Sequence, residues 1–340
     1  MSIPPFPPEY RASGVLLHIA SLPSPYGIGD LGPAARAWVD RLRESGQSWW
    51  QALPLGPTGY GNSPYQSLSS FAGNELLISP DGLIEDGLLR AGDCNGNSFP
   101  GAAIDYGAVI PFKRRILEKA WSNFRVGERE DLQAVYEQFC NTHRHWLDDY
   151  ALFRALKARH SDAYYLQWPA ELVRRVPEAL ARARQELASQ IDQVRFAQFL
   201  LFRQGERLKE HAHAGGLRLI GDLPFFVSSD SSDIWANPEL FLLDEQHRPR
   251  FVAGVPPDYF SATDSSGAIQ FTTGTLFVVP ATAGVSIDCA LSWHTLMSFA
   301  WTISADSRPL GTSRPEHRRR NPADGCPARA PSSSRRCRRS

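Results

Sequence analysis

The sequence predicts an α/β fold built on a parallel sheet, and three features support this prediction. Apolar segments at 14–19 and 48–55 are predicted as short buried strands, and segment 30–46 between them is predicted as a helix. A strand, a helix and a second strand in this order form a βα unit, whose two strands lie parallel in one sheet. A third apolar segment, 217–227, follows a long helical pattern and extends the same alternation.

The first predicted helix carries recognisable signals at both ends. Asp30 is placed to cap its start, Pro33 suits its first turn, and Gly46 suits its end. The apolar residues recur at helical spacing and define an inward stripe. This stripe consists of Ala35, Trp38, Val39 and Leu42.

The second long helix is predicted over 191–216, where Gly215 and Gly216 stop it. Asp222 interrupts the strand that follows. A loop and a short helix are then predicted over 228–241, with Asp230 and Asp233 as candidate caps of that helix. One face of the long helix carries Val194, Ala197, Leu201 and Leu208.

The end of the recognisable pattern is predicted as a small hairpin that runs into a proline-rich loop, over 243–260. Beyond Gly267 the alternation of helix and strand stops. Segment 305–340 holds ten arginines and three acidic residues, and segment 304–340 holds no Phe, Trp, Tyr, Ile or Val. Such a segment buries too little apolar surface to offset its ordering entropy, so we expect it to be disordered.

Composition excludes several classes of protein. Apolar residues make up 42% and charged residues 21% of the chain, as in an average soluble protein, and no apolar run reaches the ~18 residues that span a membrane. The first ten residues lack the features of a secretory signal. The five cysteines show no metal-binding spacing, which favours a reducing cytoplasm. His211 and His213 are interpreted as solvated rather than as metal ligands.

The segment "GPTGYGNSPYQSLSSFAGN", residues 56–74, follows the second strand and contains no charged side chain. In barrels of βα units, chemistry gathers on the loops that follow the strands. Tyrosine rings pack against the C–H groups of sugars, and Asn62, Ser63 and Gln66 can exchange hydrogen bonds with sugar hydroxyls. The lack of charge argues against phosphate or nucleic acid as the ligand. Composition alone leaves an ordinary packed loop equally open.

The same segment carries a resemblance to a known family. "LPLGPTGYGNSPYQSLSSFAGN", "GVLLHIASLPSPYGIGDLG", "LIGDLPFFVSSDSSDIWANPELFLLD" and "VAGVPPDYFSATD" closely resemble motifs of the amylomaltase-type 4-α-glucanotransferases, and the resemblance covers about residues 10–264. It implies a (β/α)8 barrel with an inserted, mostly helical subdomain. It also implies retaining transfer of α-1,4-glucan segments between maltooligosaccharides, without a metal or cofactor.

The resemblance also implies roles for single residues in substrate binding. Tyr60 matches a tyrosine of an accessory glucan-binding groove, while Ser63 and Tyr65 match residues that contact the donor sugar. Asp222 matches an aspartate that binds the donor glucose at the end of a barrel strand. The other interpretation of Asp222 is a buried carboxylate that caps a neighbouring helix, because an unpartnered carboxylate is costly inside a core.

Two further residues belong to a loop that the family places over its active site. Segment 254–263 matches this mobile loop, and Tyr259 and Phe260 lie at its tip. The simpler interpretation of these two residues is a rigid turn shaped by the preceding prolines.

The chain is expected to divide into four parts. Residues 10–80 would begin the barrel and carry the glucan-binding loop, and residues 81–190 would form the helical insertion. Residues 191–264 would continue the barrel, truncated after its third strand, and carry the active-site loop. Residues 265–340 depart from the family and are interpreted as either disordered or frame-shifted.

No catalytic residue is identified. A retaining mechanism needs two carboxyl groups about 5 Å apart, and the R-I-D-H-F-R-G-like segment in which the family carries its nucleophile is missing from the sequence. Divergence explains this, and so does a shift of reading frame near codon 264, which would yield arginine, proline and serine from a GC-rich gene. The nucleotide sequence across that codon distinguishes divergence from a frame shift, because a shift requires the missing motifs in another reading frame.

Two other functions stay open: a non-catalytic glucan-binding fragment and an α-amylase-like hydrolase. The sequence does not indicate an oligomeric state.

Overall fold

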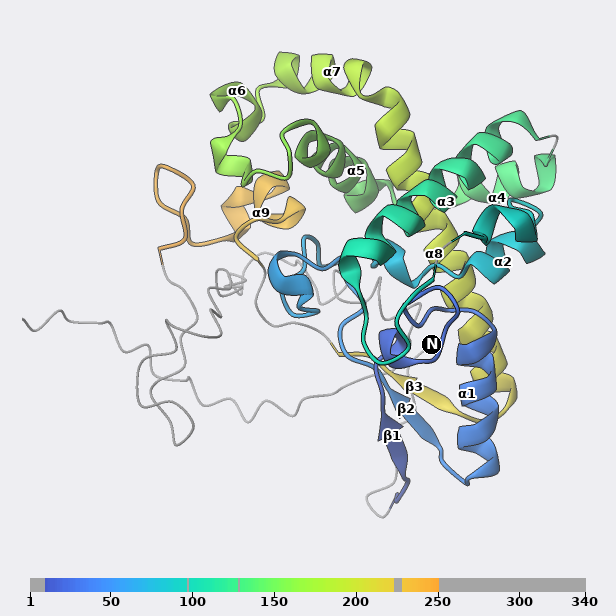
Figure 1. Ribbon diagram of the computed structural model, residues 1–340. Coiled ribbons are helices and arrows are strands. Elements are labelled where there is room, and N and C mark those ends of the chain that lie inside the picture. Colours follow the sequence, from blue (N-terminus) through green and yellow to red (C-terminus); the bar gives the residue numbers. More distant parts are fainter. Residues whose placement is uncertain (1–9, 97, 128, 223–227, 251–340) are drawn as a thin grey trace, which may run out of the picture. The chain divides into compact units, whose positions relative to one another are not determined.

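The computed structural model describes residues 10–96, 98–127, 129–222 and 228–250 (Figure 1). Within these ranges the chain is mostly helical and contains one small parallel sheet. The strands are β1 (Gly14–Leu16), β2 (Trp49–Gln51) and β3 (Arg218–Ile220). The helices are α1 (Pro33–Glu44), α2 (Pro80–Glu85), α3 (Tyr106–Val126), α4 (Glu130–Thr142), α5 (Arg144–Arg159), α6 (Ala170–Val173), α7 (Pro177–Glu186), α8 (Ala188–Ala214) and α9 (Ser232–Ala236).

The described sheet has the order β1-β2-β3, with both pairs of strands parallel, as the βα alternation predicts. Val15, Trp50 and Leu219 lie opposite one another across the three strands. Each strand is only three residues long, so the predicted strands were too long. The latter part of the third predicted strand, 223–227, lies outside the described residues.

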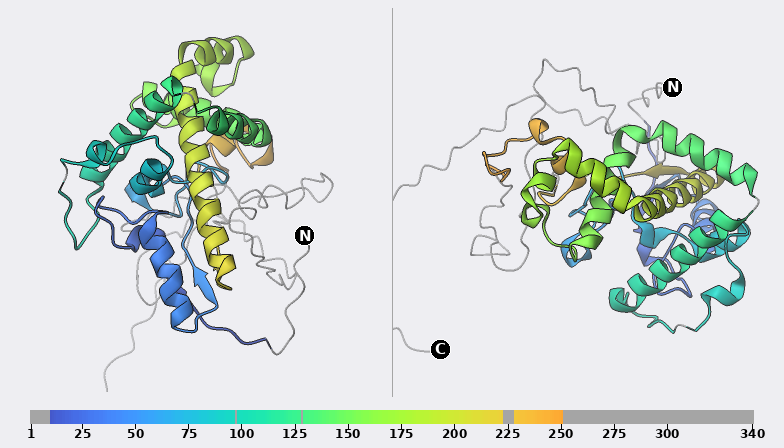
Figure 2. Two further views of the ribbon diagram at one scale, coloured as in Figure 1. Left: turned by 90° about the vertical axis from the view of Figure 1, so that its right-hand side faces the viewer. Right: turned by 90° about the horizontal axis from the view of Figure 1, so that it is seen from above.

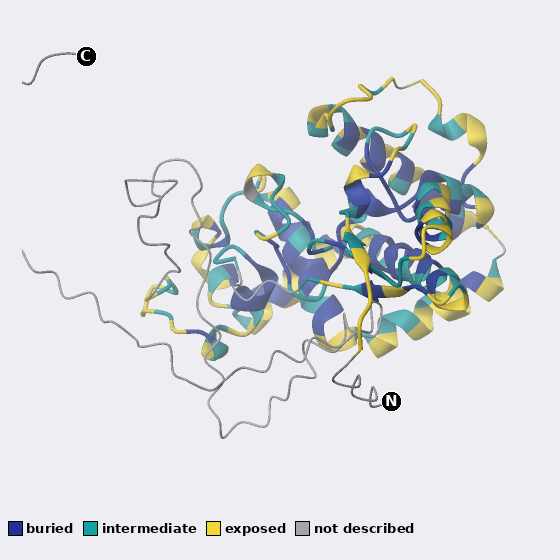
Figure 3. Ribbon diagram, turned by 90° about the horizontal axis from the view of Figure 1, so that it is seen from below, coloured by how far each residue is buried: buried dark blue, intermediate teal, exposed yellow. Residues whose placement is uncertain are grey.

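The prediction that segment 14–19 forms a buried strand was wrong. Leu16 is 55% exposed, and the backbone turns into a short 3-10 helix at Ile19–Ser21. The reason is the alternation of side chains: Val15 and Leu17 pack against the main hydrophobic cluster, so Leu16 lies on the opposite face of the described sheet. Figure 3 shows exposed residues in the stretch of chain next to the N-terminal end. Hydrophobicity alone does not show whether a strand is central or at an edge, or whether both of its faces are covered.

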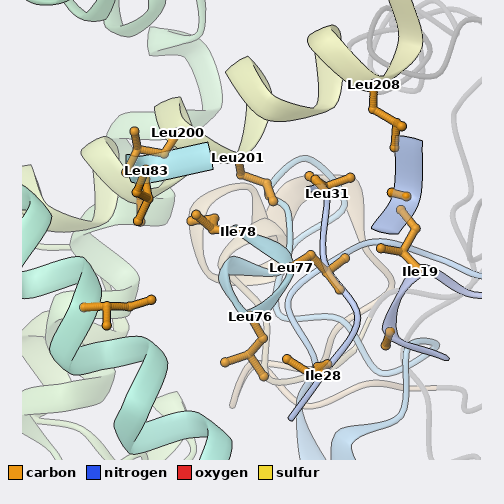
Figure 4. Close-up of a cluster of buried hydrophobic side chains, with 14 of the residues drawn as sticks. Ile19, Ile28, Leu31, Leu76, Leu77, Ile78, Leu83, Leu200, Leu201 and Leu208 are labelled. Carbon is orange, nitrogen blue, oxygen red and sulfur yellow. The ribbon is translucent and has the colours of Figure 1, made fainter. Parts of the chain in front are cut away.

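One face of the sheet packs on α1 and α8, which contact each other beside it (Figure 2). Trp50 and Leu219 belong to the main hydrophobic cluster, and Val15 packs against it. The helix α8 runs the length of this cluster, and Figure 4 shows Leu200 and Leu201 above Leu83 and Ile78. From α1 the cluster takes Ala35, Val39 and Leu42, which were predicted to face inward, while Trp38 packs against it partly buried.

The ends of α1 confirm two of the three predicted signals. Pro33 is its first residue, and Gly46 follows its end with φ +71°, a conformation that favours glycine. The N-cap residue is Gly32, so the prediction that Asp30 caps the helix was wrong. Asp30 accepts a hydrogen bond from the backbone N–H of Gly32 at 3.0 Å, and its second oxygen lies 3.7 Å from the ammonium group of Lys113.

The helices α5, α6, α7 and α9 enclose a second hydrophobic cluster, which the first turn of α8 also joins. Its aromatic centre consists of Phe153, Trp168 and Trp235, whose rings lie within 6 Å of one another. The long helix predicted over 191–216 is confirmed as α8, which ends at Ala214 before Gly215 and Gly216. Because α8 contributes side chains to both clusters, it links the sheet to the helical part of the chain.

The buried pair Lys113–Asp30 generates a prediction about stability. Lys113 is fully buried, donates to the carbonyl of Ile78 at 2.6 Å, and has Asp30 as its charged partner. Burial lowers the pKa of Lys113 and raises that of Asp30, and the attraction between the two charges opposes both shifts. Replacing Asp30 by Ala should lower the free energy of unfolding by about 3–5 kcal/mol, because it leaves a buried cation without its partner.

Urea unfolding followed by circular dichroism measures this loss. The matched control is Asp40→Ala, which removes a partly exposed carboxylate that pairs with Arg43 and His211 and should cost less than about 1 kcal/mol. Equal losses in the two variants would contradict the role given to Asp30.

Candidate functional site

The uncharged segment 56–74 folds into a small hairpin directly after β2. Thr58 and Ser67 form an antiparallel bridge, and the backbone N–H of Gly59 donates to Gln66 at 2.7 Å. A side chain at Gly59 would lie 2.8 Å from that Gln66 carbonyl, so the close approach of the two arms requires glycine. The tip of the hairpin is a 3-10 turn, Tyr60–Asn62.

Two fully buried glutamines of α8 hold the chain where it leaves this hairpin. The side-chain amide of Gln198 accepts from the N–H of Gly73 at 2.8 Å and donates to its carbonyl at 2.9 Å. Gln204 makes the same pair of bonds with Ser79, at 2.7 and 3.1 Å. Each side chain thereby satisfies both polar groups of one buried peptide position, which would otherwise be costly to bury.

The helix α9 holds the middle of the segment. The backbone N–H of Ser70 donates to the buried carboxylate of Asp233 at 2.6 Å, and the hydroxyl of Ser69 donates to it at 3.4 Å. The N–H of Ser232 donates to the carbonyl of Leu68 at 2.9 Å. Burial raises the pKa of Asp233, and the hydrogen bonds from the serines around it oppose this shift.

The prediction that Asp230 and Asp233 cap the short helix was wrong. The N-cap is Ser231, whose hydroxyl accepts from the N–H of Ile234 at 3.3 Å. Asp230 instead pairs with Lys157 near the end of α5, with 2.6 Å between the ammonium nitrogen and Oδ2. Burial raises the pKa of Asp230, and the charge and hydrogen bond of Lys157 oppose this shift. The two carboxylates therefore tie α9 to other parts of the chain.

The structure brings Tyr65 and Asp222 together. The phenol of Tyr65 donates to Oδ2 of Asp222 at 2.7 Å, which joins the hairpin after β2 to the segment after β3. Tyr65 is 38% exposed, so part of this residue remains open to solvent. Burial raises the pKa of Tyr65 to about 12, and the hydrogen bond and negative charge of Asp222 act in the same direction. At neutral pH the phenol is therefore a hydrogen-bond donor.

The other expected contacts are placed less completely. Ser63 lies two residues before Tyr65 and is partly exposed, and its hydroxyl accepts from the N–H of Tyr65 at 3.4 Å. Tyr60 lies in the turn at the tip of the hairpin. Tyr259 and Phe260, with the loop 254–263, lie outside the described residues.

The two histidines near the end of α8 differ in their surroundings. His213 is exposed, as predicted, and His211 is partly exposed, with its Nε2 3.0 Å from the carboxylate of Asp40. Among the described residues no group of three or more potential ligands is arranged to hold a metal ion. None of the described helices is long and apolar enough to cross a membrane.

Comparison with known proteins identifies the family. The family model described as 4-alpha-glucanotransferase matches residues 17–265. The chain belongs to this family. The match ends within one residue of the point at which the resemblance to the family was predicted to stop.

Individual relatives agree with this assignment. The chain is 47% identical over 253 residues to a 4-alpha-glucanotransferase of Thermus thermophilus, and 47% identical over 255 residues to that of Aquifex aeolicus. These matches cover 74% of this chain and 50% and 51% of the relatives. The chain thus spans about half the length of the curated relatives it matches.

A solved structure gives the same result for the fold. The amylomaltase of Streptococcus agalactiae in complex with acarbose matches with a TM-score of 0.71 at 41% identity, over 75% of this chain and 52% of that one. This similarity supports an α/β fold of the glycoside-hydrolase type.

Sequence reasoning missed the residues that hold the hairpin in place. Gln198 and Gln204 are fully buried polar residues on the inward side of α8. Gln198 interrupts an apolar run, Phe196 to Phe202, which was a weak signal, whereas Gln204 lies between Arg203 and Gly205 and has no such signal. Asp233 fits a local pattern for a helix cap, but its partner is Ser70, more than 160 residues away in the sequence.

Removing the carboxylate of Asp233 should loosen the hairpin. Asp233→Ala leaves the partly buried N–H of Ser70 without its acceptor, so we expect the free energy of unfolding to fall by about 1–3 kcal/mol. Asp233→Asn keeps an acceptor oxygen and should lose less. Thermal unfolding measures both, with Glu239→Ala, an exposed acid shortly after α9, as the control. Stability equal to that control in Asp233→Ala would contradict the anchoring role.

The bond between Tyr65 and Asp222 predicts a spectroscopic change. With the pKa of Tyr65 at about 12, about a tenth of this phenol is ionised at pH 11, against about nine tenths for an ordinary tyrosine. Asp222→Asn removes the negative charge and should lower this pKa toward 10. The difference in absorbance at 295 nm between each protein and its Tyr65→Phe derivative isolates this phenol. Asp244→Asn is the control, and an unchanged titration in Asp222→Asn would exclude the interaction.

Proposed function

We propose that this chain forms the donor-sugar side of a 4-α-glucanotransferase site, in a protein that transfers α-1,4-glucan segments between maltooligosaccharides with retention. The observation that carries the proposal is the 2.7 Å hydrogen bond between Tyr65 and Asp222. It joins a hairpin without charged side chains to a carboxylate that follows a parallel strand. Membership of the family supplies the reaction, and this pair of residues supplies the place for the sugar.

The two side chains have complementary tasks in binding a neutral sugar. The open face of Tyr65 packs against sugar C–H groups, as aromatic rings do with other apolar surfaces. Asp222 fixes the phenol and, because each carboxylate oxygen accepts more than one hydrogen bond, also accepts from a sugar hydroxyl. The hydroxyl of Ser63 lies in the same turn and adds a third polar contact.

The larger architecture is part of the proposal. The three parallel strands are the beginning of a (β/α)8 barrel, formed by residues 10–80 and 191–264, and residues 81–190 are its helical insertion. Residues 265–340 are the part that departs from the family. Tyr60 then belongs to an accessory glucan-binding groove, and Tyr259 and Phe260 belong to a loop over the site. The protein acts in the cytoplasm on α-1,4-glucans, without a metal or cofactor.

Catalysis sets a limit on what these residues can do. Retaining transfer needs one carboxylate as nucleophile and another carboxyl group as acid and base. Asp222 cannot serve as both, and the sequence contains no R-I-D-H-F-R-G-like segment. This absence favours a second candidate function for the 340-residue chain itself, namely glucan binding without catalysis.

Incubation of the 340-residue chain with maltotriose separates these functions. We expect binding without products. Release of glucose together with maltopentaose would mean that the chain itself catalyses transfer, and would contradict the limit derived above. Glucose and maltose without longer products would indicate a hydrolase.

Tyr65→Ala should weaken the binding of maltooligosaccharides by about 1–3 kcal/mol, because it removes a packing face and a hydroxyl. Calorimetric titration with maltotriose measures this change. Tyr10→Ala is a matched control: Tyr10 is 39% exposed and hydrogen-bonded to Trp49 at the start of β2, away from the hairpin. Unchanged affinity in Tyr65→Ala would remove Tyr65 from the site.

A further inference from the structure

The register of the sheet places a histidine in the same row as Asp222. Leu16, Gln51 and Ile220 lie opposite one another at the carboxyl ends of the three strands. His18 and Asp222 each lie two residues further along the chain, beyond the ends of β1 and β3. The backbone ladder continues beyond the paired residues, through the bonds Leu17 N–H to Gln51 O at 2.9 Å and Ala52 N–H to Ile220 O at 3.0 Å.

The alternation of side chains puts His18 and Asp222 on the same face. On β1 and beyond it, Val15, Leu17 and Ile19 belong to or pack against the main hydrophobic cluster. His18 has an extended backbone (φ −70°, ψ 141°), so its side chain leaves from the opposite face, like that of Leu16. On β3, Leu217 and Leu219 belong to the cluster. Asp222 accordingly leaves from the face opposite to the helices.

The side chain of His18 has an unused polar atom at this edge. Its Nδ1 is buried and has no hydrogen-bond partner in the described part of the chain. Burial lowers the pKa of His18, so the ring is neutral at neutral pH. A neutral imidazole nitrogen either donates or accepts, according to the tautomer. A buried polar atom without a partner is costly, and a ligand hydroxyl would satisfy it.

The spacing fits one sugar between the two residues. Neighbouring strands lie about 4.8 Å apart, so the backbones at His18 and Asp222, two strands apart, are separated by about 10 Å. The phenol of Tyr65, which is bonded to Asp222, comes from a third element, the hairpin after β2. A hexose has hydroxyl groups around its whole rim and can bond to both sides.

We infer that His18 is a substrate-contacting residue, whose Nδ1 forms a hydrogen bond with a hydroxyl of the sugar that Tyr65 and Asp222 hold. This inference rests on the proposed glucan site and adds β1 to the elements that form it. His18 contributes selectivity for a neutral sugar, because a neutral imidazole pairs with a hydroxyl without introducing charge.

The test is calorimetric titration of the 340-residue chain with maltotriose. His18→Leu removes the polar atom and should weaken binding about 3–10-fold, the loss expected for one hydrogen bond. His18→Asn retains a hydrogen-bonding group close to the position of Nδ1 and should bind within about twofold of the unchanged chain. His213→Leu, the same substitution at an exposed histidine, is the matched control and should leave the affinity unchanged.

A second measurement decides the matter if His18→Leu fails to fold. In 15N-labelled protein, the imidazole signals of His18 are those missing from His18→Asn, and maltotriose should shift its Nδ1 resonance but not those of His213. Normal binding by His18→Leu, or an Nδ1 signal that does not respond to bound maltotriose, would overturn this inference alone. Absence of maltotriose binding by the unchanged chain would overturn the proposed glucan site, and this inference with it.

Discussion

The position of the candidate site depends on two buried amide clamps on α8. Gln198 holds Gly73 and Gln204 holds Ser79, each through two hydrogen bonds. Gln198 and Gln204 are six residues apart in the sequence, and so are Gly73 and Ser79. Six residues of α-helix rise about 9 Å, whereas the same number of extended residues reaches about 20 Å. The segment between the clamps must therefore coil, and it forms the 3-10 turn Glu75–Leu77 that Asn74 caps.

The two glutamine clamps act together with two buried or partly buried carboxylates, Asp233 and Asp230. Asp233 of α9 holds the middle of the hairpin segment, and the pair Lys157–Asp230 holds the chain just before α9 to the end of α5. Tyr65 and Asp222 meet between these fixed points. The groups of the proposed sugar site thus come from loops, but buried polar contacts define the paths of those loops. A site prepared in this way loses little conformational entropy on binding.

Sequence reasoning succeeded where the signal was local. Pro33 and Gly46 mark the ends of α1, and Gly215 and Gly216 mark the end of α8, because each residue acts through its own backbone conformation. The βα alternation likewise predicted the parallel order of the strands. The exposure of Leu16 was not predicted, because it depends on whether the second face of the sheet is covered, which the local sequence does not show.

The candidate site could be predicted only in part from the sequence, because its contacts join residues that are distant along the chain. The motifs around Tyr65 and Asp222 identified the family, but the hydrogen bond between them joins residues 157 positions apart. Asp233 matched a helix cap by local pattern, and only its distant partner Ser70 reveals its role. Lys157 and the two glutamines have no local signature beyond a polar residue within a buried stripe. Partners of this kind are set by tertiary packing, which a single sequence does not display.

The equal spacing of the two clamps has a consequence for how this region can change in length. An insertion or deletion between Gly73 and Ser79 would move one of these residues away from the glutamine that bonds to it. The buried amide group of that glutamine would then have no hydrogen-bond partner. The tip of the hairpin carries no such constraint, since a side chain at Gly61 would meet no atom within 4 Å. Natural variation in loop length should therefore concentrate at the tip. The end of the hairpin nearest α8 should keep its length wherever the two glutamines are kept.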